Sequence, residues 1–326
     1  MKTASFTTAA TLLALLLLLA ASRAGAQDQT SATITQNGIG NQSYVEQHQA
    51  SSESQLTITQ FGNYNSVGDP DARTGGIVQR GTDRMRITFV QQGDYNQAAF
   101  GQIAGDKDLA FVNQTGNGNF AAIQQHSAYE SVVRIEQNGD RNRIDSTGGD
   151  ILAYGFTASQ TGSDNAASLT RSGSGFGGPR VTQEGVSNRA SATQDQADYS
   201  FIEIRQLGMD NQAVASQINT RFNGISLIEQ NGNGNQAAVV ANGAENVSTT
   251  TQTGNGNHTS IVQSLFANGS TINQTGSINS ASITQTGSAA PAQDARNTAW
   301  ITQSGDGFWA TITQTGSGNS GGIYQH

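Results

Sequence analysis

The chain of 326 residues contains no cysteine, only 3 prolines and only 12% charged residues. The absence of cysteine excludes disulfides, thiol nucleophiles and zinc sites with cysteine ligands. Apolar residues make up 35% of the chain, which is too little for an ordinary globular core of this length. The scarcity of charge and proline is equally atypical of disordered chains. A net charge of −8 argues against nucleic acid as a partner.

Glycine and side-chain amides are abundant instead, with 39 Gly, 34 Gln and 27 Asn. These residues form a repeated word, Gln-x-Gly-x-x-Asn, with a period of about 23 residues. The word begins at Gln36, Gln60, Gln91, Gln114, Gln137, Gln160, Gln183, Gln206, Gln230, Gln252 and Gln274. A twelfth copy at Gln303 keeps Gly305 but has Phe308 in place of Asn. The repeat therefore runs through nearly the whole chain.

The N-terminal segment, residues 1–26, has the pattern of a secretory signal peptide. Lys2 gives it a positive start, residues 12–19 form an apolar run, and Ala24 and Ala26 frame a small-x-small cleavage site. The apolar run is too short for the roughly 20 residues of a membrane-spanning helix, and no other segment is apolar enough. We therefore predict a repeat domain over residues 27–326, located outside the cytoplasm and without a membrane span.

Each repeat consists of two similar halves with period-2 patterning. Bulky apolar residues such as Ile58 and Ile204 stand two positions before the first Gln, and Ala98 and Ala121 stand two positions after the Asn. This alternation is the signature of β-strands, and the Gly/Asn-rich stretch between the halves suits a tight turn. A two-stranded unit cannot bury its apolar face alone, whereas stacked units can. The sequence thus predicts an all-β fold, a β-solenoid of about twelve strand-turn-strand rungs with two facing parallel sheets.

The glutamines and asparagines share the parity of the apolar positions, so we expect them to point inward. An isolated buried amide would cost a few kcal/mol. Identical amides stacked in register instead donate to one neighbour and accept from the other, as in cross-β ladders. The predicted ladder residues are Gln36, Asn41, Gln47, Gln60, Asn65, Gln91, Asn96, Gln102, Gln114, Asn119, Gln125, Gln137, Asn142, Gln160, Asn165, Gln183, Asn188, Gln194, Gln206, Asn211, Gln217, Gln230, Asn235, Gln252, Asn257, Gln263, Gln274, Asn279, Gln285, Gln303, Gln314, Asn319 and Gln325. Gly148, Arg171 and Ala241 replace the second Gln, and we expect weaker rungs there.

The repeat resembles the curlin repeat, whose pattern is Ser-x5-Gln-x-Gly-x-x-Asn-x-Ala-x3-Gln. Ser131, Gln137, Gly139 and Asn142 match its first half. The rest of the pattern is matched by Gln206, Gly208, Asn211, Ala213 and Gln217. The resemblance extends over about residues 31–325.

This resemblance implies a secreted subunit of curli, the functional amyloid fibres of bacterial biofilms, with a role in adhesion. It further implies other copies of the chain, a nucleator subunit and an outer-membrane secretion pore as partners. Whether the chain is the major subunit or a nucleator stays open, and so does the role of the insertions at 67–76 and 288–296.

No catalytic, cofactor or metal site is expected. The histidines follow a repeat Gln or Asn, as His126 and His258 do, so the pattern places them at outward or turn positions. A disordered Gln/Asn-rich tail is disfavoured because β-branched residues recur at fixed positions. The regular short rungs likewise disfavour a carbohydrate-active β-helix enzyme. A soluble surface-displayed solenoid that acts as a binding module or adhesin remains the alternative function.

Overall fold

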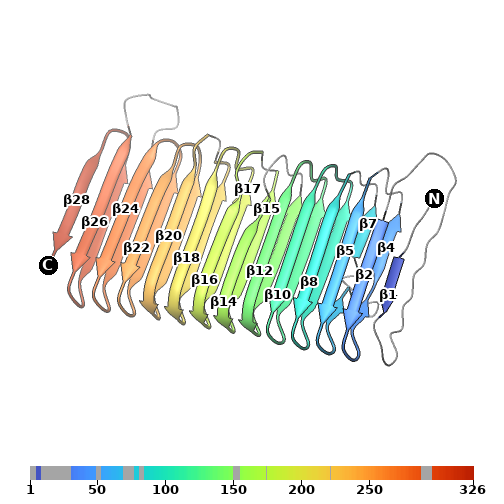
Figure 1. Ribbon diagram of the computed structural model, residues 1–326. Helices are drawn as coiled ribbons and strands as arrows, with labels where there is room; N and C mark the ends of the chain where they lie inside the picture. Colours follow the sequence, from blue (N-terminus) through green and yellow to red (C-terminus); the bar gives the residue numbers. More distant parts are fainter. Residues whose placement is uncertain are drawn as a thin grey trace. The chain divides into compact units, whose positions relative to one another are not determined.

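The computed structural model describes residues 5–8, 31–48, 53–68, 77–80, 84–149, 155–173, 175–220, 222–287 and 296–326. Throughout these residues the chain forms strands and turns without a helix, so they contain no helix that could cross a membrane. Two compact units divide the chain, Met1–Asp164 and Asn165–His326, called unit 1 and unit 2 below. Figure 1 shows the strands of each unit as a succession of flat, stacked turns.

Unit 1 consists of two parallel sheets. The strands of its first sheet are, in order, β1 (Ser5–Thr8), β2 (Ser31–Asn37), β5 (Gln55–Phe61), β8 (Arg86–Gln92), β10 (Leu109–Thr115), β12 (Val132–Asp140) and β14 (Thr157–Ser163). Its second sheet contains β13 (Arg143–Gly149), β11 (Phe120–His126), β9 (Gln97–Ile103), β6 (Ser66–Val67) and β3 (Gln42–Ser43), and β9 also pairs with β7 (Ile77–Arg80), which pairs with β4 (Val45–His48).

Unit 2 repeats the arrangement. The first sheet of unit 2 contains β16 (Pro179–Val186), β18 (Phe201–Met209), β20 (Ile225–Asn233), β22 (Val247–Thr253), β24 (Asn268–Thr275), β26 (Asn297–Ser304) and β28 (Ser320–Gln325). The second contains β15 (Ala166–Ser172), β17 (Arg189–Asp195), β19 (Gln212–Ile218), β21 (Gln236–Asn242), β23 (His258–Ser264), β25 (Ser280–Thr286) and β27 (Trp309–Thr315).

The strand register follows the sequence repeat. In unit 1, Gln114 lies beside Gln137, and in unit 2 Gln206 lies beside Gln230. A complete turn of the solenoid consists of one stretch in the first sheet, a tight connection and one stretch in the second sheet. The described part of unit 1 contains five such turns, and that of unit 2 contains six. The predicted all-β solenoid with two facing parallel sheets is confirmed, with about eleven turns rather than about twelve. The repeat that begins at Gln160 contributes β14 to unit 1 and β15 to unit 2, so it completes no turn within either unit.

A thin apolar core separates the two sheets of each unit. Ile135 and Ile144 in unit 1 and Ile204 and Val239 in unit 2 are almost completely buried, as the strand alternation predicts. Each such side chain contributes about 1.5–3 kcal/mol of hydrophobic stabilisation. Residues between them, such as Arg134, face outward on the same strands. The core fixes which face of each strand is internal, and therefore which amides face one another.

The turn between the two halves of a repeat requires glycine. Gly116 has a φ of +107°, and a Cβ built on it would lie 2.1 Å from the carbonyl oxygen of Gly139 in the next turn. The same contact recurs at Gly208 and the carbonyl oxygen of Gly232, at 2.0 Å. Any larger residue would force successive turns apart, because neighbouring strands are held only about 4.8 Å from each other.

Most of the predicted signal peptide lies outside the described residues. Its described part, Ser5–Thr8, forms β1, which pairs in parallel with β2. Of the two insertions, residues 69–76 and 288–295 also lie outside the described part of the chain.

Candidate functional site: the amide ladders

The first glutamine of each repeat forms a hydrogen-bonded ladder in unit 1. Nε2 of Gln36 donates to Oε1 of Gln60 at 2.7 Å, and Gln60 donates in the same way to Gln91 at 2.8 Å. The ladder continues from Gln91 through Gln114 and Gln137 to Gln160 at 2.8–2.9 Å. Gln36 is half-buried, whereas the five that follow it are at most 2% exposed.

The same ladder runs through unit 2. It begins at Gln183 and passes through Gln206, Gln230, Gln252, Gln274 and Gln303 to Gln325, with Nε2–Oε1 distances of 2.8–3.0 Å. Each amide also donates its second hydrogen across the core, as Gln206 does to the carbonyl oxygen of Arg189 at 3.0 Å. One side chain therefore links successive turns along the stack and also ties the two facing sheets together.

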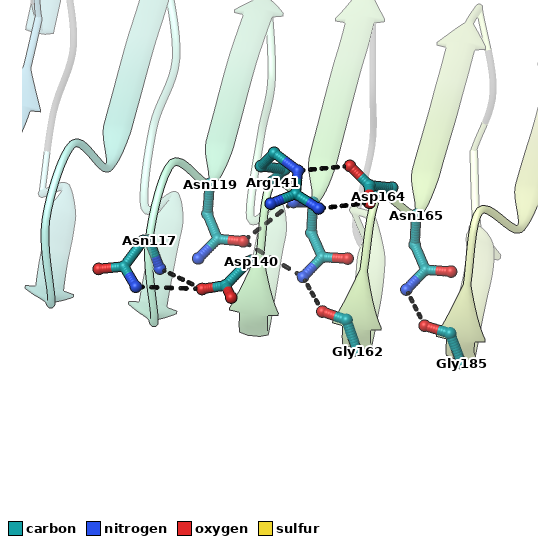
Figure 2. Close-up of polar contacts among 9 residues, drawn as sticks. Asn117, Asn119, Asp140, Arg141, Gly162, Asp164, Asn165 and Gly185 are labelled. Carbon is teal, nitrogen blue, oxygen red and sulfur yellow. Dashed lines mark hydrogen bonds and ion pairs between the residues drawn. The ribbon is translucent and has the colours of Figure 1, made fainter.

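The asparagines form a second ladder at the turn. Nδ2 of Asn142 donates to Oδ1 of Asn119 at 3.2 Å and to the carbonyl oxygen of Gly162 in the next turn at 2.7 Å. In unit 2, Asn165 donates to the carbonyl oxygen of Gly185 at 2.9 Å (Figure 2). The backbone N–H of each Asn donates to Oδ1 of the preceding one, as Asn211 does to Asn188 at 3.1 Å. The Gly and Asn of the repeat thus act together across turns.

The remaining predicted Asn residues take part in equivalent contacts. These are Asn41, Asn65 and Asn96 in unit 1 and Asn235, Asn257, Asn279 and Asn319 in unit 2. Asn319 differs in one respect, because it joins a ladder at the opposite turn, where it bonds to Oδ1 of Asn297 at 3.1 Å.

The ladder of second glutamines is interrupted. In unit 2, Gln194 donates to Gln217 at 2.9 Å, and Gln263 donates to Gln285, which donates to Gln314. Beside Ala241, Gln217 donates to Oγ of Ser226 instead. In unit 1, Gln125 lies beside Gly148 and donates to Oγ of Ser131, while Gln102 donates to Oδ2 of Asp108. The side chain of Gln47 lies outside the described part of the structure.

A second asparagine ladder was not predicted from the sequence. Asn246, Asn268 and Asn297 are fully buried at the opposite turn of unit 2, and Nδ2 of each later one donates to Oδ1 of the one before at 2.9–3.0 Å. A sequence signal was present, because Asn242-Gly243-Ala244-Glu245-Asn246 keeps the Gly and Asn of the repeated word after its Gln has become Ala241.

Carboxylates and amides on the turn surface add further contacts between turns. Oδ1 of Asp140 accepts the backbone N–H of Asn117 at 2.9 Å, and Arg141 forms a two-point ion pair with Asp164 (Figure 2). The Arg141 guanidinium holds the pKa of the Asp164 carboxyl below its ordinary value. Exposed ion pairs of this kind contribute little to stability, but they can form only when the strands of successive turns are paired in this register.

The described residues hold no group of three or more histidines and carboxylates that could bind a metal. His126, His258 and His326 are exposed, and the side chain of His48 lies outside the described residues.

Fold and site together define a parallel β-solenoid repeat protein with internal amide ladders. Residues 295–326 match the family model of the curlin associated repeat. This match confirms the resemblance predicted from the repeat and is consistent with the curlin-repeat family. A search of curated proteins finds no match to the chain.

Proposed function

We propose that the chain is a secreted structural protein that assembles into curli-like amyloid fibres of the cell surface and contributes to adhesion. The observation that carries this proposal is the register-locked glutamine ladder. Every turn presents the same donor and acceptor to the next, so another copy in the same register continues the ladder without new chemistry. The curlin repeat and the β-solenoid are compatible with such a structural protein.

The outermost strands supply the surfaces for this growth. Among the described residues, β28 pairs with β26 alone, and its Gln325 accepts from Gln303. In unit 1, β2 carries Gln36, and β1 beside it belongs to the segment that signal-peptide cleavage removes. Parallel pairing of β28 in one copy with β2 in another places Gln325 beside Gln36. Such a head-to-tail contact is heterologous, and its repetition adds one copy after another to the ladder.

Secretion and partners follow from the same proposal. The curlin-repeat family is extracellular, which agrees with the predicted signal peptide at residues 1–26. A nucleator subunit would present the first template edge, and an outer-membrane pore would export the chain before it folds. In this account the surface of the fibre is an adhesive scaffold, and catalysis has no part in it.

The test is assembly of purified residues 27–326 after removal of denaturant. We expect thioflavin-positive fibres in electron micrographs, a meridional reflection near 4.8 Å in fibre diffraction, and seeding of fresh monomer by fragments. A β-rich chain that stays monomeric and does not seed would contradict the proposal. That outcome would favour a soluble solenoid that acts as a binding module or adhesin on the surface.

A further inference from the structure

A fully buried carboxylate, that of Asp108, lies in the loop between β9 and β10 of unit 1. Oδ1 of Asp108 accepts the backbone N–H of Ser131 at 2.7 Å, and Oδ2 accepts Nε2 of Gln102. Gly105 covers this pair closely, since a Cβ built on it would lie 2.1 Å from Nε2 of Gln102 and 2.4 Å from Oδ2 of Asp108. The chain therefore forms a cradle of fixed shape around the carboxylate and the amide.

Two buried acceptor oxygens beside this carboxylate have no donor among the described residues. They are Oε1 of Gln102 and Oε1 of Gln125. The two glutamines lie side by side in register on β9 and β11, where a closed ladder would join Nε2 of Gln102 to Oε1 of Gln125. Asp108 takes that donor, so the ladder is open at this point. Each orphaned acceptor is costly in a core, and two together at one position call for an explanation.

In unit 2, a neutral residue occupies the repeat position that corresponds to Asp108. Asn268 stands six residues before its repeat's first Gln, as Asp108 does before Gln114. There the second ladder is closed, because Gln263 donates to Gln285 at 3.0 Å. Asn268 meanwhile bonds to Asn246 rather than to a ladder glutamine. A side chain without a charge at this position thus occurs together with an intact ladder.

We propose that Asp108 is a proton-binding site, and that binding of one proton closes the second glutamine ladder of unit 1. The proton adds to Oδ2, which changes from an acceptor into a donor. The Gln102 amide turns over, so that Oδ2–H donates to Oε1 of Gln102. The released Nε2 of Gln102 then donates to Oε1 of Gln125. One proton provides partners for both orphaned oxygens, and the hydrogen bond from Ser131 to Oδ1 is unchanged.

The charged groups around Asp108 do not neutralise it. Arg84 pairs with Asp106, and Lys107 pairs with Glu130, all on the exposed side of the turn. Among the described residues, the titratable and charged groups on the surrounding elements are Asp106 and Lys107 on its own turn, Arg84 and Arg86 on the preceding turn, Tyr129 and Glu130 on the following turn, and His126 at the end of β11. The pKa of Asp108 is raised to about 6, chiefly by burial and also by the nearby charge of Asp106, against hydrogen bonds from Ser131 and Gln102 that lower it.

The direction of the pH effect follows from this shift. The carboxyl binds a proton more tightly in the folded chain than in the unfolded chain, where its pKa is near 3.8. The resulting stabilisation is complete below the unfolded pKa and is lost as the pH rises through about 6. Between pH 7 and pH 5 the equilibrium constant for opening should fall about tenfold.

Hydrogen exchange on the full chain tests the proposal. Backbone amides of β9 and β11 should gain about tenfold in protection factor from pH 7 to pH 5, relative to β23 and β25 in unit 2. Asp108→Asn should remove this pH response, because a neutral amide imitates the protonated acid. Asp106→Asn changes an exposed carboxylate on the same turn and should keep the response. Equal pH dependence in wild type and Asp108→Asn would overturn the proposal.

A second measurement uses the wild-type chain, so it does not depend on whether a variant folds. The carboxyl carbon shift of Asp108 in the wild-type chain should titrate between pH 7 and pH 5. A carboxyl that stays ionised to pH 5 would contradict proton binding. A further control adds calcium at pH 7 and follows the amides of β9 and β11. If calcium reproduces their gain in protection, the proposal is overturned, because the Asp108 carboxyl would then be a cation ligand.

Discussion

Nδ2 of Asn142 lies 2.7 Å from the carbonyl oxygen of Gly162, one turn further along unit 1. The same pairing joins Asn119 to Gly139 at 2.7 Å in the turn before. Each Asn therefore donates to the carbonyl oxygen of the Gly in the next turn. This contact explains why Gly and Asn recur together, three residues apart, in nearly every repeat.

Substitution of Asn142 by Ala should destabilise unit 1 by about 1–3 kcal/mol. The change removes the donor to a part-buried backbone carbonyl and interrupts the asparagine ladder. Denaturant titration of the full chain provides the measurement. Arg141→Ala, one residue away on the exposed surface, should change little. Equal losses in the two variants would mean that the ladder adds nothing beyond an ordinary surface contact.

Gly116→Ala should destabilise the chain by about 2 kcal/mol or more. The added Cβ would meet the Gly139 carbonyl oxygen, and the φ of +107° is strained for any L-residue with a side chain. Thermal unfolding followed by circular dichroism measures the effect. Gly149→Ala is the matched control, because no heavy atom lies within 4 Å of its Cβ position. If Gly116→Ala is as neutral as the control, close contact between turns is not the reason for glycine.

Thr250→Val should stabilise unit 2 by about 1 kcal/mol. Thr250 occupies the core column between Ile228 and Ile272, and its buried Oγ1 has no partner among the described residues. Valine keeps the shape and removes the cost of the buried hydroxyl. A shift in the guanidinium midpoint would show this gain. Thr251→Val, on the outer face of the same strand, should give no comparable gain.

Arg171→Gln should also stabilise unit 2, by about 1–3 kcal/mol. Arg171 is 1% exposed and pairs in register with Gln194, whose buried Oε1 has no donor in the described part of the chain. Burial lowers the pKa of Arg171 to about 10, while the charge of Asp198 acts in the opposite direction. Glutamine removes the buried charge and supplies the missing donor. Destabilisation by this change, with Arg180→Gln neutral, would instead assign Arg171 an essential structural role.

Much of the fold was predictable because two periods coincide in the sequence. Alternation by two decides which side chains face inward, and the 23-residue repeat decides which of them meet in the next turn. Residues such as Gln114 and Asn119 are thereby specified twice, and the structure places both inside with partners of their own kind. Alternation and repeat length together were sufficient for these positions.

The interruptions of the second ladder were not predictable in the same way. Gly148 and Ala241 are visible as substitutions, but the partner that a ladder glutamine finds in their absence depends on the opposite turn. Asp108 takes the donor of Gln102 although Gln125 stands in register beside it. Turn length and local geometry decide this competition, and neither follows from the period. The Asn246 ladder was not predicted because Ala241 replaces the glutamine that opens the repeated word.

The central claim is that inward amides, rather than outward side chains, hold successive turns in register during assembly. The most direct measurement compares seeded fibre growth of Gln206→Ala/Gln217→Ala with that of Arg205→Ala/Ser216→Ala, using thioflavin fluorescence and wild-type seeds. Both pairs of substitutions lie on β18 and β19, and they differ in the face that is changed. The account predicts that the glutamine double variant elongates much more slowly, while the outward double variant grows close to the wild-type rate. Equal rates in the two variants would contradict it.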